Sequence, residues 1–145
     1  MTAKEYLSEI HKQRRLLRTL ELRAEELRTQ AEGVKAIKYD RDKVQVSPTN
    51  MMEEIVPKLV EVEEQIGRQI IRVQLEIDKR IEQIAQMRPD HAEVLLQRYV
   101  DTDHGKPLTW EQIAVNIHRS FVRVTHLHGE ALAEFTRRFL KVDKL

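Results

Sequence analysis

Residues 109–132 read TWEQIAVNIHRSFVRVTHLHGEAL, and this stretch predicts two short helices joined by a tight turn. Thr109 suits a helix N-terminus because its hydroxyl can accept a hydrogen bond from a backbone N–H that has no partner inside the helix. Gln112, three positions later, can complete a capping box. One apolar stripe follows, formed by Ile113, Ala114 and Ile117. This spacing predicts the first short helix.

The second helix is expected to start at Phe121, with Ser120 as its N-cap. The turn before it comprises His118, Arg119 and Ser120. The buried stripe of this helix is expected at Val124, Leu127, Ala131 and Phe135, with Leu132 and Phe139 as candidates to extend it. Five side chains are then left facing outward or sideways: Val122, Arg123, Thr125, His126 and Glu130.

This pattern is that of a helix-turn-helix: two helices are joined by a tight turn, and the second carries polar and basic side chains. In that motif the second helix enters the DNA major groove. The same pattern also fits a plain helical hairpin with a solvated face. A basic strip beyond it favours DNA, because cations attract phosphates. It comprises Arg137, Arg138, Lys141 and Lys144.

Residues 87–141 resemble region four of bacterial sigma factors. The resemblance lies in AEVLLQRYV at 92–100, LTWEQIAVNI at 108–117, then Ser120 and VTHLHGEAL at 124–132. The whole chain is similar to a group of phage and prophage proteins that carry this module after a long helical segment, which opens with a motif like TAKEYLSEI at 2–10. The family usually has glycine in the turn, where this chain offers Asn116 and His118. Asparagine tolerates a left-handed backbone better than most residues.

The resemblance implies a regulator of phage late-gene transcription, with activation as the expected direction. We expect Arg123 to read bases, because a guanidinium can contact guanine with two hydrogen bonds, and Val122, Thr125 and His126 to flank it. Phosphate contacts or helix caps are expected at Thr109, Ser120, His128, Arg137, Arg138 and Lys141.

Composition favours long helices with much surface. Charged residues make up 34% of the chain and aromatic residues 5%. The chain has no cysteine, which excludes disulfides and thiolate chemistry. No apolar run approaches the roughly 18 residues that span a bilayer, and no signal-peptide core begins the chain. We expect a soluble cytoplasmic protein of a bacterial host cell, with no membrane partner.

Charge is uneven, although the net charge is only +1. Residues 118–145 hold six Lys and Arg against three Asp and Glu, and residues 1–38 hold nine against six. Residues 49–87 hold five against eight. The basic C-terminal segment favours a nucleic-acid partner, because attraction to phosphate is local. The opposite charges of the first two segments favour their lying together.

Two heptad-like seams predict a long antiparallel helical pair over residues 1–87. The first seam runs through Tyr6, Ile10, Gln13, Leu17, Leu20, Ala24, Leu27, Ala31 and Val34. The second runs through Leu59, Val62, Ile66, Ile70, Val73, Ile77, Ile81 and Ile84. A loop is expected at about 38–50, and residues 88–145 are expected to form the helix-turn-helix domain.

Three residues bear on the helix ends. Gly33 is a plausible breaker of the first long helix, and Pro89 should end the second. Pro57 leaves two alternatives, in which the second helix begins close to it or is kinked there. The apolar stripe of the second helix is widened by Val56 and Ile71, which leaves a second chain open as a further packing partner.

Other chemistry is poorly supported. His126 and His128 are two positions apart, so on a helix they point about 200° apart and cannot share an ion. DTDHGKP at 101–107 misses the ligand pattern of a calcium loop and reads as a polar turn. Trp110 is interpreted as a core anchor rather than a stacking residue for a partner. We expect no metal, no cofactor and no enzymatic activity.

The predicted class is therefore all-α: a long helical hairpin followed by a helix-turn-helix that binds double-stranded DNA. RNA polymerase and a second copy of the chain are left open as partners, because such modules often bind DNA in pairs. The rival interpretation is a helical adaptor that binds another protein, for example RNA polymerase, and has no DNA specificity of its own.

Overall fold

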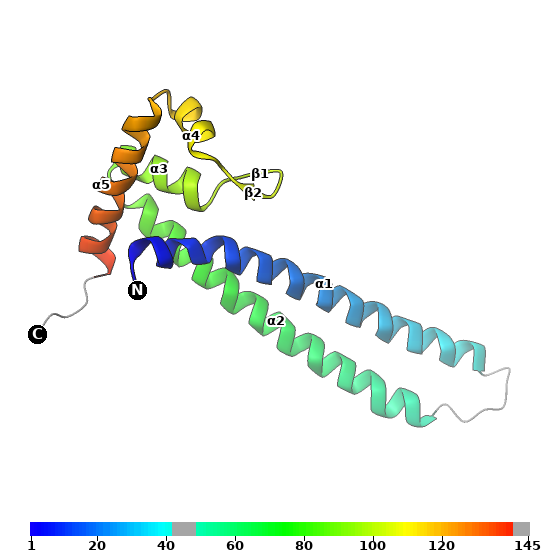
Figure 1. The fold of residues 1–145 in the computed structure, drawn as a ribbon. Helices are drawn as coiled ribbons and strands as arrows, with labels where there is room; N and C mark the ends of the chain where they lie inside the picture. The colour runs from blue at the N-terminus through cyan, green and yellow to red at the C-terminus, as the bar shows by residue number, and fades with distance from the viewer. Residues whose placement is uncertain (42–48, 141–145) are drawn as a thin grey trace, which may run out of the picture. The chain divides into compact units, whose positions relative to one another are not determined.

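The computed structural model describes residues 1–41 and 49–140, with side chains for 1–33 and 55–140. These residues form five helices and one two-stranded antiparallel sheet (Figure 1), which confirms the all-α class. The elements are α1 (Ala3–Arg41), α2 (Thr49–Ala85), α3 (Pro89–Tyr99), β1 (Thr102–Asp103), β2 (Lys106–Pro107), α4 (Trp110–Ile117) and α5 (Phe121–Phe139).

The chain divides into two compact units. We call Met1–Arg14 with Leu75–Leu145 the terminal unit, and Arg15–Gln74 the hairpin unit. This division differs from the boundary expected between residues 87 and 88. The start of α1 and the end of α2 belong with the helix-turn-helix, because their apolar side chains contribute to its core.

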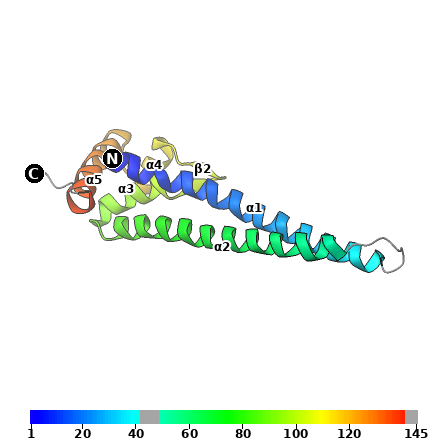
Figure 2. The ribbon, with the colours of Figure 1, turned by 90° about the horizontal axis from the view of Figure 1, so that it is seen from below.

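In the hairpin unit, α1 and α2 lie side by side and run antiparallel, as Figures 1 and 2 both show. Their core joins Ala24, Leu27 and Ile66, with Leu20, Leu59 and Ile70 packed around it. At the surface, Arg28 Nε lies 2.6 Å from Glu63 Oε1. The members of the two seams whose side chains are described in this unit are confirmed, except that Val62 remains 37% exposed. The side chain of Val34 lies outside the described ones.

The helix ends within this unit differ from expectation. α1 continues through Gly33 to Arg41, so the glycine does not break it. α2 begins at Thr49, which places Pro57 inside the helix and rules out a start close to the proline. The expected loop at 38–50 is therefore shorter at both ends, and its centre at 42–48 lies outside the described residues.

The terminal unit buries one face of the first turns of α1. Ala3, Leu7 and Ile10 are 4%, 0% and 0% exposed. The ring centroid of Tyr6 lies 5.7 Å from that of Phe135 in α5. The heptad seam included Tyr6 and Ile10 but omitted Ala3 and Leu7. The seam contains the residues expected to pack against α2, whereas the start of α1 also packs against α5.

The second long helix ends where the sequence predicted. α2 ends at Ala85, before Pro89, and Pro89 begins α3. A proline is tolerated there because the first backbone N–H groups of a helix have no intrahelical partner. The polar turn predicted at 101–107 is a tight β-hairpin. Its two central residues, His104 and Gly105, have φ of 52° and 83°, as a two-residue type I′ turn requires.

Candidate nucleic-acid interface

The first helix of the helix-turn-helix, α4, begins at the predicted capping box. The Gln112 backbone N–H donates to Thr109 Oγ1 at 3.2 Å, and the Thr109 N–H donates to Gln112 Oε1 at 2.8 Å. Ile113 is fully buried against Leu108 and Val124, with Trp110, Ala114 and Ile117 packed around them. The capping box sets where α4 begins, and the apolar stripe packs α4 against α5.

His118 makes the turn between the two helices. It adopts the left-handed conformation, with φ of 56° and ψ of 45°. The backbone N–H groups of His118 and Arg119 donate to Val115 and Ala114, respectively, in the pattern of a Schellman motif. Asn116, the other candidate for this position, lies inside α4 and donates to Gln97 Oε1 at 3.0 Å.

Helix α5 starts at Phe121, as predicted, with the Ser120 hydroxyl accepting a hydrogen bond from the Arg123 N–H at 3.1 Å. Its buried stripe is also confirmed: Val124, Leu127, Ala131 and Phe135 are at most 3% exposed. Leu132 and Phe139 are half-buried. Ser120 therefore acts as a helix cap, which is one of the two roles expected for it.

The outer face of α5 carries most of the predicted base readers. Val122 is 63% exposed, and Arg123 and His126 are also exposed. At about 100° per residue, Val122 lies roughly opposite the buried stripe, with His126 one turn further along the same side. Thr125 is half-buried and donates its hydroxyl hydrogen to the Val122 carbonyl at 2.8 Å, so it lies beside this face.

His128, where a phosphate contact or a cap is expected, packs against α3 and α4. His128 is half-buried, and its Nε2 lies 2.7 Å from the Tyr99 hydroxyl. Its ring centroid is 4.6 Å from that of Trp110. Burial, together with the positive charges of Arg98 and Lys4, lowers the pKa of His128 to about 4. The ring is therefore neutral at pH 7 and holds α5 against α3 and α4.

Trp110 packs as a core anchor, as interpreted from the sequence. It belongs to the cluster around Ile113, and the Arg98 guanidinium carbon lies 4.2 Å from its ring centroid. Arg98 also donates to the Leu108 carbonyl at 2.8 Å. These contacts hold the Arg98 guanidinium against the protein in the terminal unit.

Arg138, which is also expected to hold a phosphate, makes contacts within the protein. Its guanidinium donates to Glu134 Oε2 at 3.1 Å and to the Gln86 carbonyl at 2.9 Å. Arg137 is exposed. Lys141 and Lys144 lie outside the described residues, so the described part of the basic strip consists of Arg137 and the ion-paired but still exposed Arg138.

Glu134 is a buried acid that the sequence interpretation missed, because it took only apolar residues as the buried side of α5. Glu134 is 6% exposed, and its Oε1 lies 2.6 Å from Nδ1 of His91, itself 5% exposed. Burial alone would raise the pKa of Glu134, but hydrogen bonds from His91 and Arg138 lower it. The sequence did contain a signal for this burial, because Glu134 lies one helical turn from both Ala131 in the buried stripe and Arg138.

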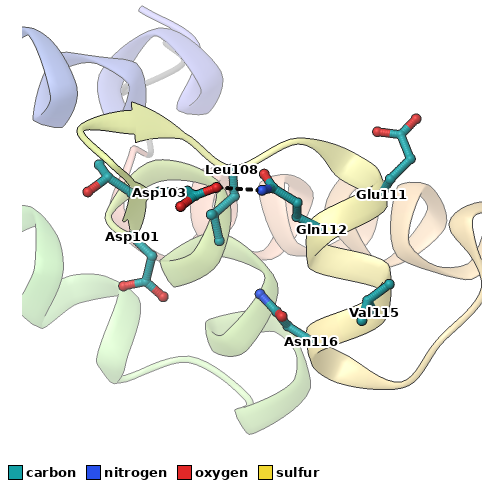
Figure 3. Close-up of a pocket in the computed structure, with 8 residues that line it drawn as sticks. Asp101, Asp103, Leu108, Glu111, Gln112, Val115 and Asn116 are labelled. Atoms are coloured by element: carbon teal, nitrogen blue, oxygen red, sulfur yellow. Dashed lines mark hydrogen bonds between the residues drawn. The ribbon is translucent and has the colours of Figure 1, made fainter.

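A groove of about 680 Å³ lies between the β-hairpin and α4 (Figure 3). Gln112 Nε2 donates across it to Asp103 Oδ2 at 2.8 Å. Three carboxylates and no cation line it, so it disfavours phosphate. Its lining residues are Asp101, Thr102, Asp103, Leu108, Glu111, Gln112, Val115 and Asn116.

Comparison with protein-family models, curated proteins and solved structures found no match to this chain. No helix within the described residues is long and apolar enough to cross a membrane. In that same part of the chain, no group of three metal-binding side chains comes together. The residues themselves therefore carry the functional argument.

Proposed function

We propose that this chain is a sequence-specific DNA-binding transcriptional regulator that reads the major groove with α5. The observation that carries the proposal is the start of α5: a capped helix after a tight turn, with Val122, Arg123 and His126 exposed. Residues in the first turns of the second helix are those that reach base edges in a helix-turn-helix.

Arg123 is suited to the central role. No carboxylate of the described residues forms an ion pair with it, whereas Arg138 on the same helix is paired. A free guanidinium can donate two hydrogen bonds to O6 and N7 of guanine. Arg119 is exposed beside the N-cap and adds positive charge where phosphates would approach.

The biological setting rests on the family resemblance. The sigma-region-four-like residues support regulation of phage or prophage genes in a bacterial host, with activation as the proposed direction. RNA polymerase is the partner that this resemblance favours. A second copy of the chain is proposed as well, because Ile71 in the hairpin unit is 61% exposed and Val60 is 41% exposed.

Selection of bound duplexes from random DNA tests the proposal. We expect one sequence to be enriched, with an affinity that falls steeply between low and high salt, because each phosphate contact releases counterions. Two-fold symmetry in the enriched site would support a dimer, which light scattering measures directly. Recovery of no preferred sequence, or affinity independent of salt, would contradict the proposal.

The acidic groove favours a second candidate, an adaptor that binds a protein and has no DNA specificity. Its carboxylates with Leu108 and Val115 suit a basic and apolar protein segment better than a nucleic acid. Under this candidate, purified RNA polymerase would retain the wild-type chain but not Glu111→Lys, while selection would enrich no DNA. Retention of both proteins, with an enriched DNA site, would favour the regulator.

A further inference from the structure

The first turn of α5 exposes two large apolar side chains. Phe121 is 48% exposed and Val122 is 63% exposed. The other large apolar residues of the helix are buried or half-buried in the core. A single exposed apolar side chain needs no explanation, but Val122 lies opposite the buried stripe and next to Arg123. A partner that accepts Arg123 at this end of α5 also comes close to Val122, which points about 100° away from it around the helix.

The side chain of Val122 restricts what it can recognise. It offers two methyl groups and neither donates nor accepts a hydrogen bond. In the major groove, the bases present nitrogen and oxygen atoms, and the one apolar group is the C5-methyl of thymine. Beside a base that presents only polar atoms, Val122 would cover those atoms without replacing their hydrogen bonds to water, which costs free energy.

We infer that Val122 is a specificity residue that selects thymine through its C5-methyl group. This inference rests on the proposed function and extends it. Arg123 and Val122 are adjacent on the helix, so the preferred site contains a guanine for Arg123 and a thymine within the same short segment of major groove. Thymine is favoured over cytosine there because cytosine lacks the methyl group.

Deoxyuridine tests the inference, because it differs from thymidine only by the missing C5-methyl group of the base. The probe is the duplex enriched by selection, remade with deoxyuridine at one thymine at a time. We expect wild-type protein to bind one such duplex about three- to four-fold more weakly than the parent, the effect of one methyl group. Val122→Ala, which keeps only the Cβ methyl group, should discriminate less between the two duplexes.

Val115→Ala is the matched control. Val115 is 72% exposed in the same unit, but it lies on α4 at the acidic groove. This variant should keep the wild-type preference for the thymine duplex. Because Val122 is exposed, its replacement should leave the helical circular dichroism signal and the melting temperature unchanged, so lost discrimination would not reflect unfolding.

The outcomes separate the inference from the proposed function. If wild-type protein binds the enriched site but all deoxyuridine duplexes equal the parent, the inference is overturned and the regulator remains. If Val122→Ala retains the full wild-type methyl preference, another residue reads the methyl group and the inference is also overturned. If Val122→Ala instead loses RNA polymerase binding and no DNA sequence is enriched, Val122 serves a protein interface and both proposals fail.

Discussion

The Nε2 atom of His128 and the hydroxyl of Tyr99 lie 2.7 Å apart, in a hydrogen bond that joins α5 to α3. The two rings are also stacked, with centroids 5.7 Å apart. Burial raises the pKa of Tyr99 to about 12, so its hydroxyl stays protonated. His128, which the sequence predicted to contact phosphate, therefore helps to hold the proposed recognition helix in place.

The burial of His128 predicts a pH-dependent stability. The pKa of His128 is about 4 in the folded protein and 6.5 ordinarily, so the folded state binds fewer protons than the unfolded state between those values. The free energy of unfolding should therefore fall as pH decreases from 6.5 toward 4. The slope is at most about 1.4 kcal/mol per pH unit and smaller here, because the ring is partly exposed.

Denaturant unfolding at several pH values measures this slope. His128→Gln cannot gain the proton and should show a shallower loss of stability than wild type. His126→Gln, which changes an exposed histidine on the same helix, should follow the wild-type curve. Equal slopes for His128→Gln and wild type would contradict the prediction.

The buried pair of His91 and Glu134 predicts a strong stability effect. Glu134→Ala leaves a buried imidazole and the Arg138 guanidinium without their shared partner. Loss of one member of a buried hydrogen-bonded pair costs about 1–3 kcal/mol. Glu130→Ala is the control. Glu130 also faces His91, but it is exposed and its Oε2 lies 3.6 Å from His91 Nε2, so its removal should cost less. Comparable melting temperatures for the two variants would count against a structural role for Glu134.

Arg123 and Arg138 form a matched pair on one helix with opposite expected effects. Arg123→Ala should weaken binding to the enriched DNA by about 5- to 150-fold, the range for loss of one bidentate base contact, and leave the melting temperature unchanged. Arg138→Ala should lower the melting temperature and leave DNA affinity unchanged below it. Gel retardation and thermal unfolding of both variants measure the two effects, and full DNA affinity in Arg123→Ala would exclude it as the base reader.

The left-handed backbone at His118 predicts a stabilising substitution. His118→Gly removes the steric cost of a side chain at φ of 56°, so we expect a gain of about 0.5–1 kcal/mol in the free energy of unfolding. Asn116→Gly, inside α4, should instead cost about 1 kcal/mol, because glycine is a poorer helix former than asparagine and the hydrogen bond to Gln97 is lost. Both values come from denaturant unfolding. A loss of stability in His118→Gly would mean that the histidine side chain stabilises the turn.

The sequence by itself predicted the parts of the helix-turn-helix that depend on near neighbours. The capping box at Thr109 and the cap at Ser120 each join residues three positions apart. The buried stripe of α5 follows from the helical period. Such features are visible in a sequence because local geometry alone brings the participating groups together.

Tertiary structure decided the features that depend on residues far apart in the chain. His128 is turned inward by Tyr99, which lies 29 positions before it, and Arg138 is held by the Gln86 carbonyl, 52 positions away. Leu7 is buried although the heptad seam omitted it, because the start of α1 packs in the terminal unit. A basic or polar side chain on a helix can face DNA, solvent or, where it finds a partner, a neighbouring helix. Only the packing of neighbouring helices determines which of these it meets.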